Sequence, residues 1–195
     1  MTDTLSDTTK TILFASDIFG ISDAFLTLLE DVDVVSNVIK ISPYPQLQTH
    51  FKNEQQAYQC FQKHGGIDEY VLSLTDILKD HVHIKHVVGF SAGGAALYKV
   101  MSNLAASNIQ LTLFYPGQIR HFMDKHPRAP CHIIFPESEP HFSLANVIKV
   151  LNQQSQLKVE QNSYQHGFMN KNSRSFNQTA YHHYCQMLKE LLQKM

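Results

Sequence analysis

Short apolar runs alternate along the chain with longer stretches in which apolar residues recur at helical spacing. A run such as Ile12 to Ala15 is typical of a strand buried on both faces. The spacing of Phe25, Leu28 and Leu29 instead places three apolar side chains on one helical face. The pattern predicts strands within 12–15, 33–41, 87–90, 109–117, 129–137 and 157–164. It predicts helices within 24–30, 54–80 with an interruption at 64–66, about 92–107, 144–153 and 175–195.

This alternation of strands and helices determines the expected fold class. Parallel strands need crossover connections, and helices supply them on both faces of the sheet. We therefore expect one α/β domain over residues 11–195, with a mostly parallel sheet of about six strands flanked by helices. The polar segment 1–10 has no basic region followed by an apolar run, so we expect a flexible tail rather than a secretory signal.

Composition and charge narrow the class of protein. The chain has 195 residues, of which 43% are hydrophobic and 17% charged, as expected of one globular domain. Lys and Arg number 16 and Asp and Glu 17, so the net charge of −1 gives no reason to expect nucleic acid or a membrane surface as partner. Cys60, Cys131 and Cys185 are far apart and odd in number, which favours reduced thiols. We expect a cytoplasmic protein.

The most informative stretch is "VVGFSAGG", in which a strand ends abruptly and a helix begins. Small residues at Gly89 and Gly93 would let strand and helix approach closely and leave the Ser91 hydroxyl exposed at the turn. The N–H of Ala92, at the helix N-terminus, could face a developing oxyanion. A nucleophilic Ser91 is therefore predicted. The alternative is a Gly-rich turn with an incidental serine.

A nucleophilic serine needs a base and an orienting acid. In α/β-hydrolases these follow the serine in the order acid and then histidine, each just after a later strand. His166, in "YQHGF", follows the last predicted strand, and Glu139, in "FPESEP", follows the one before it. Glu137 competes with Glu139, and local chemistry does not separate the two carboxylates.

Four segments together carry a family resemblance. "ILFASDIFGIS", "VVGFSAGGAALY", "PCHIIFPESEPHF" and "YQHGFMN" resemble successive core motifs of dienelactone hydrolase-like α/β-hydrolases. The resemblance implies that Glu139, which precedes Pro140, is the acid, and that the Ile18 N–H is a second oxyanion-hole donor. It also implies an acidic group beside the nucleophile at Asp17. Further candidates near the site are Phe19 and Phe168, from the first and last motifs, and Tyr115, a pocket-wall candidate after the fourth strand.

The chain departs from the family pattern at three points. Its nucleophile position holds Ser91 instead of cysteine, which resembles the esterase-like branch of the family, and its acid is Glu rather than Asp. An arginine expected shortly after His-Gly-Phe is replaced by Asn170, with Lys171 beside it. The resemblance and the motifs together predict a serine hydrolase acting on a small-molecule ester or lactone, with no metal, no organic cofactor and little room for a lid.

Other functions remain as alternatives. A hydrolase fold could bind a ligand or partner without turnover, and thioesters or peptides could replace esters as substrates. A nucleotide-binding domain is disfavoured because the chain has no GxxxxGK[ST] motif. The histidines His81, His83 and His86 have metal-like spacing but precede a strand, at the end opposite the expected site, so we expect them in a solvated loop.

Overall fold

The computed structural model describes residues 10–34, 36–44, 50–81, 83–104 and 108–194. These residues form one six-stranded sheet in the order β2-β1-β3-β4-β5-β6, and every neighbouring pair of strands is parallel. The strands are β1 (Thr11–Ala15), β2 (Asn37–Ile41), β3 (Ile84–Phe90), β4 (Gln110–Phe114), β5 (Cys131–Phe135) and β6 (Leu157–Gln161). The predicted single α/β domain with a parallel sheet is confirmed.

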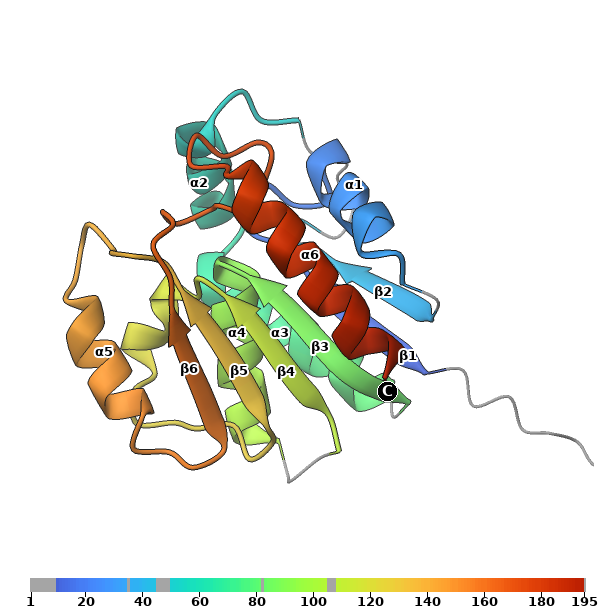
Figure 1. Cartoon of the computed structure of the whole chain (residues 1–195), viewed down its shortest axis with the longest axis vertical. Coiled ribbons are helices and arrows are strands. Elements are labelled where there is room, and N and C mark those ends of the chain that lie inside the picture. The colour runs from blue at the N-terminus through green and yellow to red at the C-terminus, as the bar shows by residue number, and fades with distance from the viewer. Residues whose placement is uncertain (1–9, 35, 45–49, 82, 105–107, 195) are drawn as a thin grey trace, which may run out of the picture.

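Helices cover both faces of this sheet (Figure 1). They are α1 (Asp23–Val32), α2 (Glu54–Lys63), α3 (Gly66–Asp80), α4 (Ala92–Asn103), α5 (Leu144–Leu151) and α6 (Gln178–Gln193). A short 3₁₀ helix, η1 (Gly117–His121), follows β4. The buried side chains of α1 and α6 pack on one face of the sheet, while those of α3, α4 and α5 pack on the other. No helix in the described part of the chain is both long and apolar enough to cross a bilayer.

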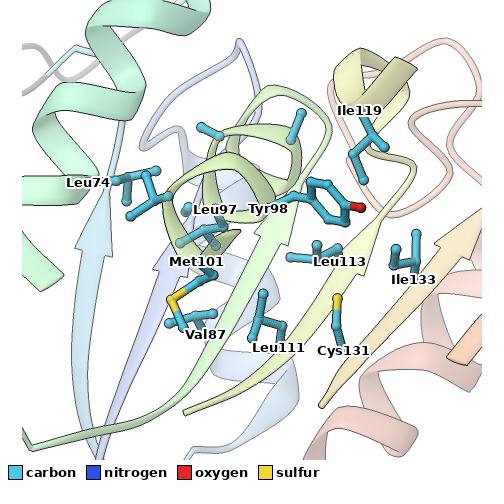
Figure 2. Close-up of a cluster of buried hydrophobic side chains, with 14 of the residues drawn as sticks. Leu74, Val87, Leu97, Tyr98, Met101, Leu111, Leu113, Ile119, Cys131 and Ile133 are labelled. Atoms are coloured by element: carbon cyan, nitrogen blue, oxygen red, sulfur yellow. The ribbon is translucent and has the colours of Figure 1, made fainter. Parts of the chain in front are cut away.

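Successive side chains along each strand point to opposite faces of the sheet and so contribute to two separate hydrophobic cores. Val87 of β3 belongs to the core under α3 and α4, whereas the next residue, Val88, belongs to the core under α1 and α6. Figure 2 shows side chains of β3, β4 and β5 beneath α4, in the same core as Leu74 of α3. Strands buried on both faces in this way read as continuous apolar runs, which is why the pattern located them.

The strand order reverses between β1 and β3. The chain passes from β1 outward to β2, then crosses back to place β3 on the other side of β1. In open α/β sheets, ligands bind at the carboxyl ends of the strands beside such a reversal. A ligand-binding site is therefore expected at the loops that follow β1 and β3.

Element boundaries differ from the sequence-based expectation in a few places. His64 and Gly65 separate α2 from α3, as predicted, and Gly65 adopts φ +85° there. The helix expected to run to about 107 ends at Asn103, and 105–107 lie outside the described residues. The predicted tail, 1–10, is also outside them apart from exposed Lys10, so it stays a prediction. The 3₁₀ helix η1 was not predicted.

The expectation of a solvated loop was wrong for one of the three histidines before β3. His81 and His83 are exposed, but β3 begins at Ile84, so His86 lies within the strand and is 1% exposed. Its Nε2 lies 2.9 Å from Oγ1 of Thr112, and its Nδ1 has no hydrogen-bond partner among the described residues. Burial lowers the pKa of His86 to about 4, because the charged imidazolium would lose its solvation.

This burial predicts acid sensitivity. An unfolded histidine titrates near pH 6.5, so the stabilisation present above pH 6.5 is lost as the pH falls toward 4. Between pH 7 and pH 5, His86 should lower the free energy of unfolding by about 2 kcal/mol. The variant His86→Gln cannot take up this proton. Its free energy of unfolding in urea should therefore fall by about 2 kcal/mol less than that of the wild type between pH 7 and pH 5. The exposed His183→Gln is the control, and equal pH dependence in all three proteins would contradict the prediction.

Candidate active site

Ser91 occupies a sharp turn between β3 and α4. Its backbone adopts φ +48° and ψ −112°, a conformation that costs a non-glycine residue on the order of 1–3 kcal/mol. The Ser91 N–H donates to the carbonyl of Phe114 at 2.9 Å, so the β3–β4 ladder continues into the turn. The hydroxyl makes no capping bond to α4 and is left for other partners.

The flanking glycines are required by close packing. A Cβ on Gly93 would lie 2.4 Å from the carbonyl oxygen of Ser16, and one on Gly89 would lie 2.6 Å from the Cα of Gly94. In both cases the obstacle is backbone, which cannot move aside as a flexible side chain can. Strand, turn and helix can therefore approach as they do only without these side chains, as the motif predicted.

The hydroxyl of Ser91 meets the imidazole of His166. Ser91 Oγ lies 2.9 Å from His166 Nε2, and His166 Nδ1 lies 2.7 Å from Oε1 of Glu139. Ser91 follows β3, Glu139 follows β5 and His166 follows β6, so three strand ends converge on one point. With Nδ1–H donating to the carboxylate, Nε2 is free to accept the serine proton.

The two candidate carboxylates differ clearly in position. The side chain of Glu139 is 8% exposed and packs against Gly117, where a Cβ would come within 3.0 Å of its Oε1. Glu137 is exposed, and its Oε2 accepts a hydrogen bond from Gln165 at 2.8 Å. Glu139 is therefore the carboxylate that contacts His166.

The loop after β1 holds the Ile18 amide in a fixed plane. The Asp17 carbonyl accepts hydrogen bonds from the Gly20 N–H at 3.0 Å and from the Ser16 hydroxyl at 3.1 Å. Because the peptide is planar and trans, the Ile18 N–H points the opposite way from that carbonyl. Within the described residues, neither this N–H nor that of Ala92 donates to another group. Both residues line the cleft around Ser91.

Asp17 lies beside the candidate site as a buried carboxylate. Its Oδ1 accepts from the Phe19 N–H at 2.9 Å, and its Oδ2 accepts from the Asn170 amide at 2.6 Å. Burial raises the pKa of Asp17, while these two hydrogen bonds and the nearby His166 oppose the rise. Asn170, at the position where an arginine was expected, thus ties the segment after His166 to the loop after β1.

The aromatic candidates divide between the cleft and the core. Phe19 and Tyr115 line the cleft, and the Tyr115 ring lies 4.9 Å from the His166 ring. Burial raises the pKa of the Tyr115 hydroxyl well above its usual range, and Asp17 adds to this. Phe168 is fully buried against Tyr115, at 5.1 Å, and does not line the cleft. Its place in the motif indicated proximity to the site but not direction.

The cleft has two arms that meet at Ser91 and His166. The first arm, about 540 Å³, runs toward α2 and the segment after His166; the second, about 450 Å³, runs toward η1. Tyr58 of α2 lines both arms and is 51% exposed. The first arm is also lined by Asp17, Phe19, Glu54, Gln55, Tyr115, Ser138, Gln165, Ser173, Arg174 and Ser175. The second arm is also lined by Ala92, Gly117, Gln118, Arg120, His121 and His141.

Sequence reasoning missed Tyr58 and Arg120. The helical pattern of 54–63 marks Tyr58 only as a surface position, so nothing in it indicates a cleft. Arg120, by contrast, follows the carboxyl end of β4, and the strand-end rule that identified Ser91 could have identified it as well. The described residues contain no group of three or more His, Cys, Asp or Glu side chains arranged to hold a metal ion.

Comparison with known proteins agrees with this architecture. No family model matches the chain. By sequence it is similar to the uncharacterised protein YczH of Bacillus subtilis (strain 168), with 26% identity over 183 residues. That match covers 87% of this chain and 86% of YczH.

Solved structures extend the likeness to the fold. A protein assigned to the alpha/beta hydrolase superfamily from Xanthomonas campestris pv. campestris matches with a TM-score of 0.66 and 15% identity, over 95% of this chain and 98% of that one. The dienelactone hydrolase of Anabaena variabilis ATCC 29413 matches with a TM-score of 0.60 and 17% identity, over 97% and 88% of the two chains. The chain therefore has the α/β-hydrolase fold.

Proposed function

We propose that this protein is a serine hydrolase that cleaves a carboxylic ester or lactone of a small molecule through an acyl-enzyme at Ser91. The observation that carries the proposal is the continuous hydrogen-bonded chain from Ser91 through His166 to Glu139, whose three residues line one cleft. A serine, an imidazole and a buried carboxylate in this order are the components of a general-base-activated nucleophile. The likeness to α/β-hydrolases, one of them a dienelactone hydrolase, supports the same reaction class.

The first half-reaction forms the acyl-enzyme. Ser91 Oγ attacks the carbonyl carbon while His166 Nε2 takes the hydroxyl proton, and the imidazolium is stabilised by Glu139. The carbonyl oxygen becomes an oxyanion that the N–H groups of Ile18 and Ala92 can stabilise, each worth roughly 3–4 kcal/mol in comparable sites. When the tetrahedral intermediate collapses, the C–O bond to the alcohol breaks and His166 returns its proton to that oxygen.

The second half-reaction releases the acid. Water enters the cleft, gives a proton to His166 Nε2 and attacks the acyl carbon, and the same two amides receive the second oxyanion. Collapse then breaks the bond to Ser91 Oγ, which recovers its proton from His166. In a lactone, the alcohol released by ring opening remains covalently attached to the acyl group throughout, so a single hydroxy acid leaves in this step instead of two separate products.

The intact hydrogen-bond chain favours turnover over a purely binding role. A binding protein would have no need for a serine in a strained conformation within 2.9 Å of an imidazole that is itself oriented by a buried carboxylate. Strain of this kind persists where the surrounding structure supports it, and it clusters at active sites. These observations support esterase chemistry over a ligand- or partner-binding role.

Covalent labelling tests the nucleophile. A fluorophosphonate should add once to the wild-type protein, as measured by intact mass, because only an activated serine attacks phosphorus at a useful rate. Ser91→Ala should take up no label, and His166→Ala should label at least about 100-fold more slowly. Ser138→Ala, which removes another serine of the same cleft, should label like the wild type. A folded wild-type protein that takes up no label would overturn the proposed function.

The two neighbouring glutamates allow a matched test of the acid. Glu139→Gln should lower kcat for a p-nitrophenyl ester by about 10²- to 10⁴-fold, because an amide NH₂ facing His166 Nδ1 favours the wrong tautomer. Glu137→Gln removes the same charge two residues away and should leave kcat nearly unchanged, since Glu137 contacts Gln165 at the surface. The opposite ranking of the two variants would show that Glu139 is not the orienting acid.

A further inference from the structure

We propose that the second arm of the cleft is a subsite for an anionic substituent, so that the preferred substrate is an ester carrying a carboxylate, bound by Arg120. This inference rests on the proposed function, because it concerns the substrate of the same serine. The arm is the part of the cleft lined by Arg120, Gln118, His121 and His141.

Arg120 is held in place but lacks a charge partner. Its Nη1 donates to the carbonyl of Gly117 at 2.8 Å, and its guanidinium lies 4.8 Å above the ring of Phe142. The residue is half-buried, and within the described residues no carboxylate lies within ion-pair distance of it. A guanidinium has five N–H donors in a planar fork that matches a carboxylate, so an oriented and unpaired one beside a nucleophile can receive an anion.

The two arms differ in charge. The first arm contains Asp17 and Glu54, and its cation, Arg174, is 89% exposed and lies 3.8 Å from Glu54. In the second arm the acidic group is Glu139, whose Oε1 is already engaged by His166. An anionic substituent would therefore be repelled from the first arm and attracted to the second.

The position of Arg120 makes the effect specific to this site. Arg120 bonds the carbonyl of Gly117, and Gly117 packs directly against the Glu139 carboxylate. One residue, Gly117, thus lies between the Arg120 guanidinium and the Glu139 carboxylate, and Arg120 lines the same cavity as Ser91 and His166. It also differs from the arginine that the family pattern would place after His166, where Asn170 binds Asp17 instead. The substrate class that fits is a monoester of a dicarboxylic acid or an acylated hydroxy acid.

Matched esters test this subsite. We would measure kcat/KM, per cleavable ester bond, for the monomethyl and dimethyl esters of glutarate and adipate, in which the distal acid is either a free carboxylate or an uncharged methyl ester. O-Acetylglycolate and its methyl ester would place the charge on the alcohol side instead. Wild type should prefer the charged member of at least one pair by about tenfold or more, as expected for a charge-assisted hydrogen bond.

Variants assign the preference to Arg120. Arg120→Gln, which keeps a donor for the Gly117 carbonyl, should abolish the preference, and Arg120→Lys should keep part of it. Arg174→Gln removes a cation from the first arm and should leave the ratio unchanged. As a readout independent of turnover, glutarate should slow fluorophosphonate labelling of the wild type more than labelling of Arg120→Gln.

The outcomes separate this inference from the proposed function. Labelling together with ester cleavage, but with equal rates for charged and neutral esters, would overturn the subsite and leave the hydrolase intact. A preference that survives in Arg120→Gln would likewise overturn the role of Arg120. No labelling and no cleavage of any ester would overturn the proposed function itself.

Discussion

The site depends on how closely α4 passes the carboxyl end of β1. At Gly93 the helix backbone comes so near to Ser16 that a Cβ would lie 2.4 Å from its carbonyl oxygen. At Gly89 the strand is packed equally tightly against the first turn of the same helix. The residues from Ala92 to Tyr98 are all buried, so the helix sits on the sheet without a polar face at this end. This approach brings the N-terminus of α4 beside the loop after β1, where the Ile18 amide lies.

Two buried tyrosines hold that loop from the side of α2 and α3. The Tyr70 hydroxyl lies 3.1 Å from the carbonyl oxygens of both Ser16 and Ile41 and can donate its hydrogen bond to either. These two carbonyls lie at the ends of the adjacent strands β1 and β2. The Tyr44 hydroxyl lies 2.9 Å from the carbonyl oxygen of Ile18 and 3.1 Å from that of Ala57 in α2. The carbonyl groups on both sides of the Asp17–Ile18 peptide therefore have fixed partners. The oxyanion-hole role proposed for the Ile18 amide requires such fixed geometry, because a donor stabilises an oxyanion best when it is oriented before the charge develops.

The sequence predicted the parts of this arrangement that depend on chain position. Ser91, Glu139 and His166 could be identified because each follows a strand, and parallel strands bring their carboxyl ends to one edge. Side-chain direction was harder to predict. His86 was expected in solvent because the spacing of apolar residues before Val87 does not show that β3 already begins at Ile84. Nor does it show that this face of the strand belongs to the core under α1 and α6. Arg120 follows a strand end as well, but the 3₁₀ turn that carries it has no hydrophobic period to show that its side chain faces the cleft.

Backbone strain at two adjacent strand ends links the hydrogen-bonded chain of Ser91, His166 and Glu139 to the second arm of the cleft. Ser91 after β3 adopts φ +48°, and Tyr115 after β4 adopts φ +39°. Each is held by a bond to the next strand, from Ser91 N–H to Phe114 and from Tyr115 N–H to Ile134 at 2.7 Å. The turn at Tyr115 directs the chain into η1, which presents Gly117 to the Glu139 carboxylate and Arg120 to the cleft. The same strained turn thus supports the carboxylate that contacts His166 and leads to the cation proposed to select the substrate.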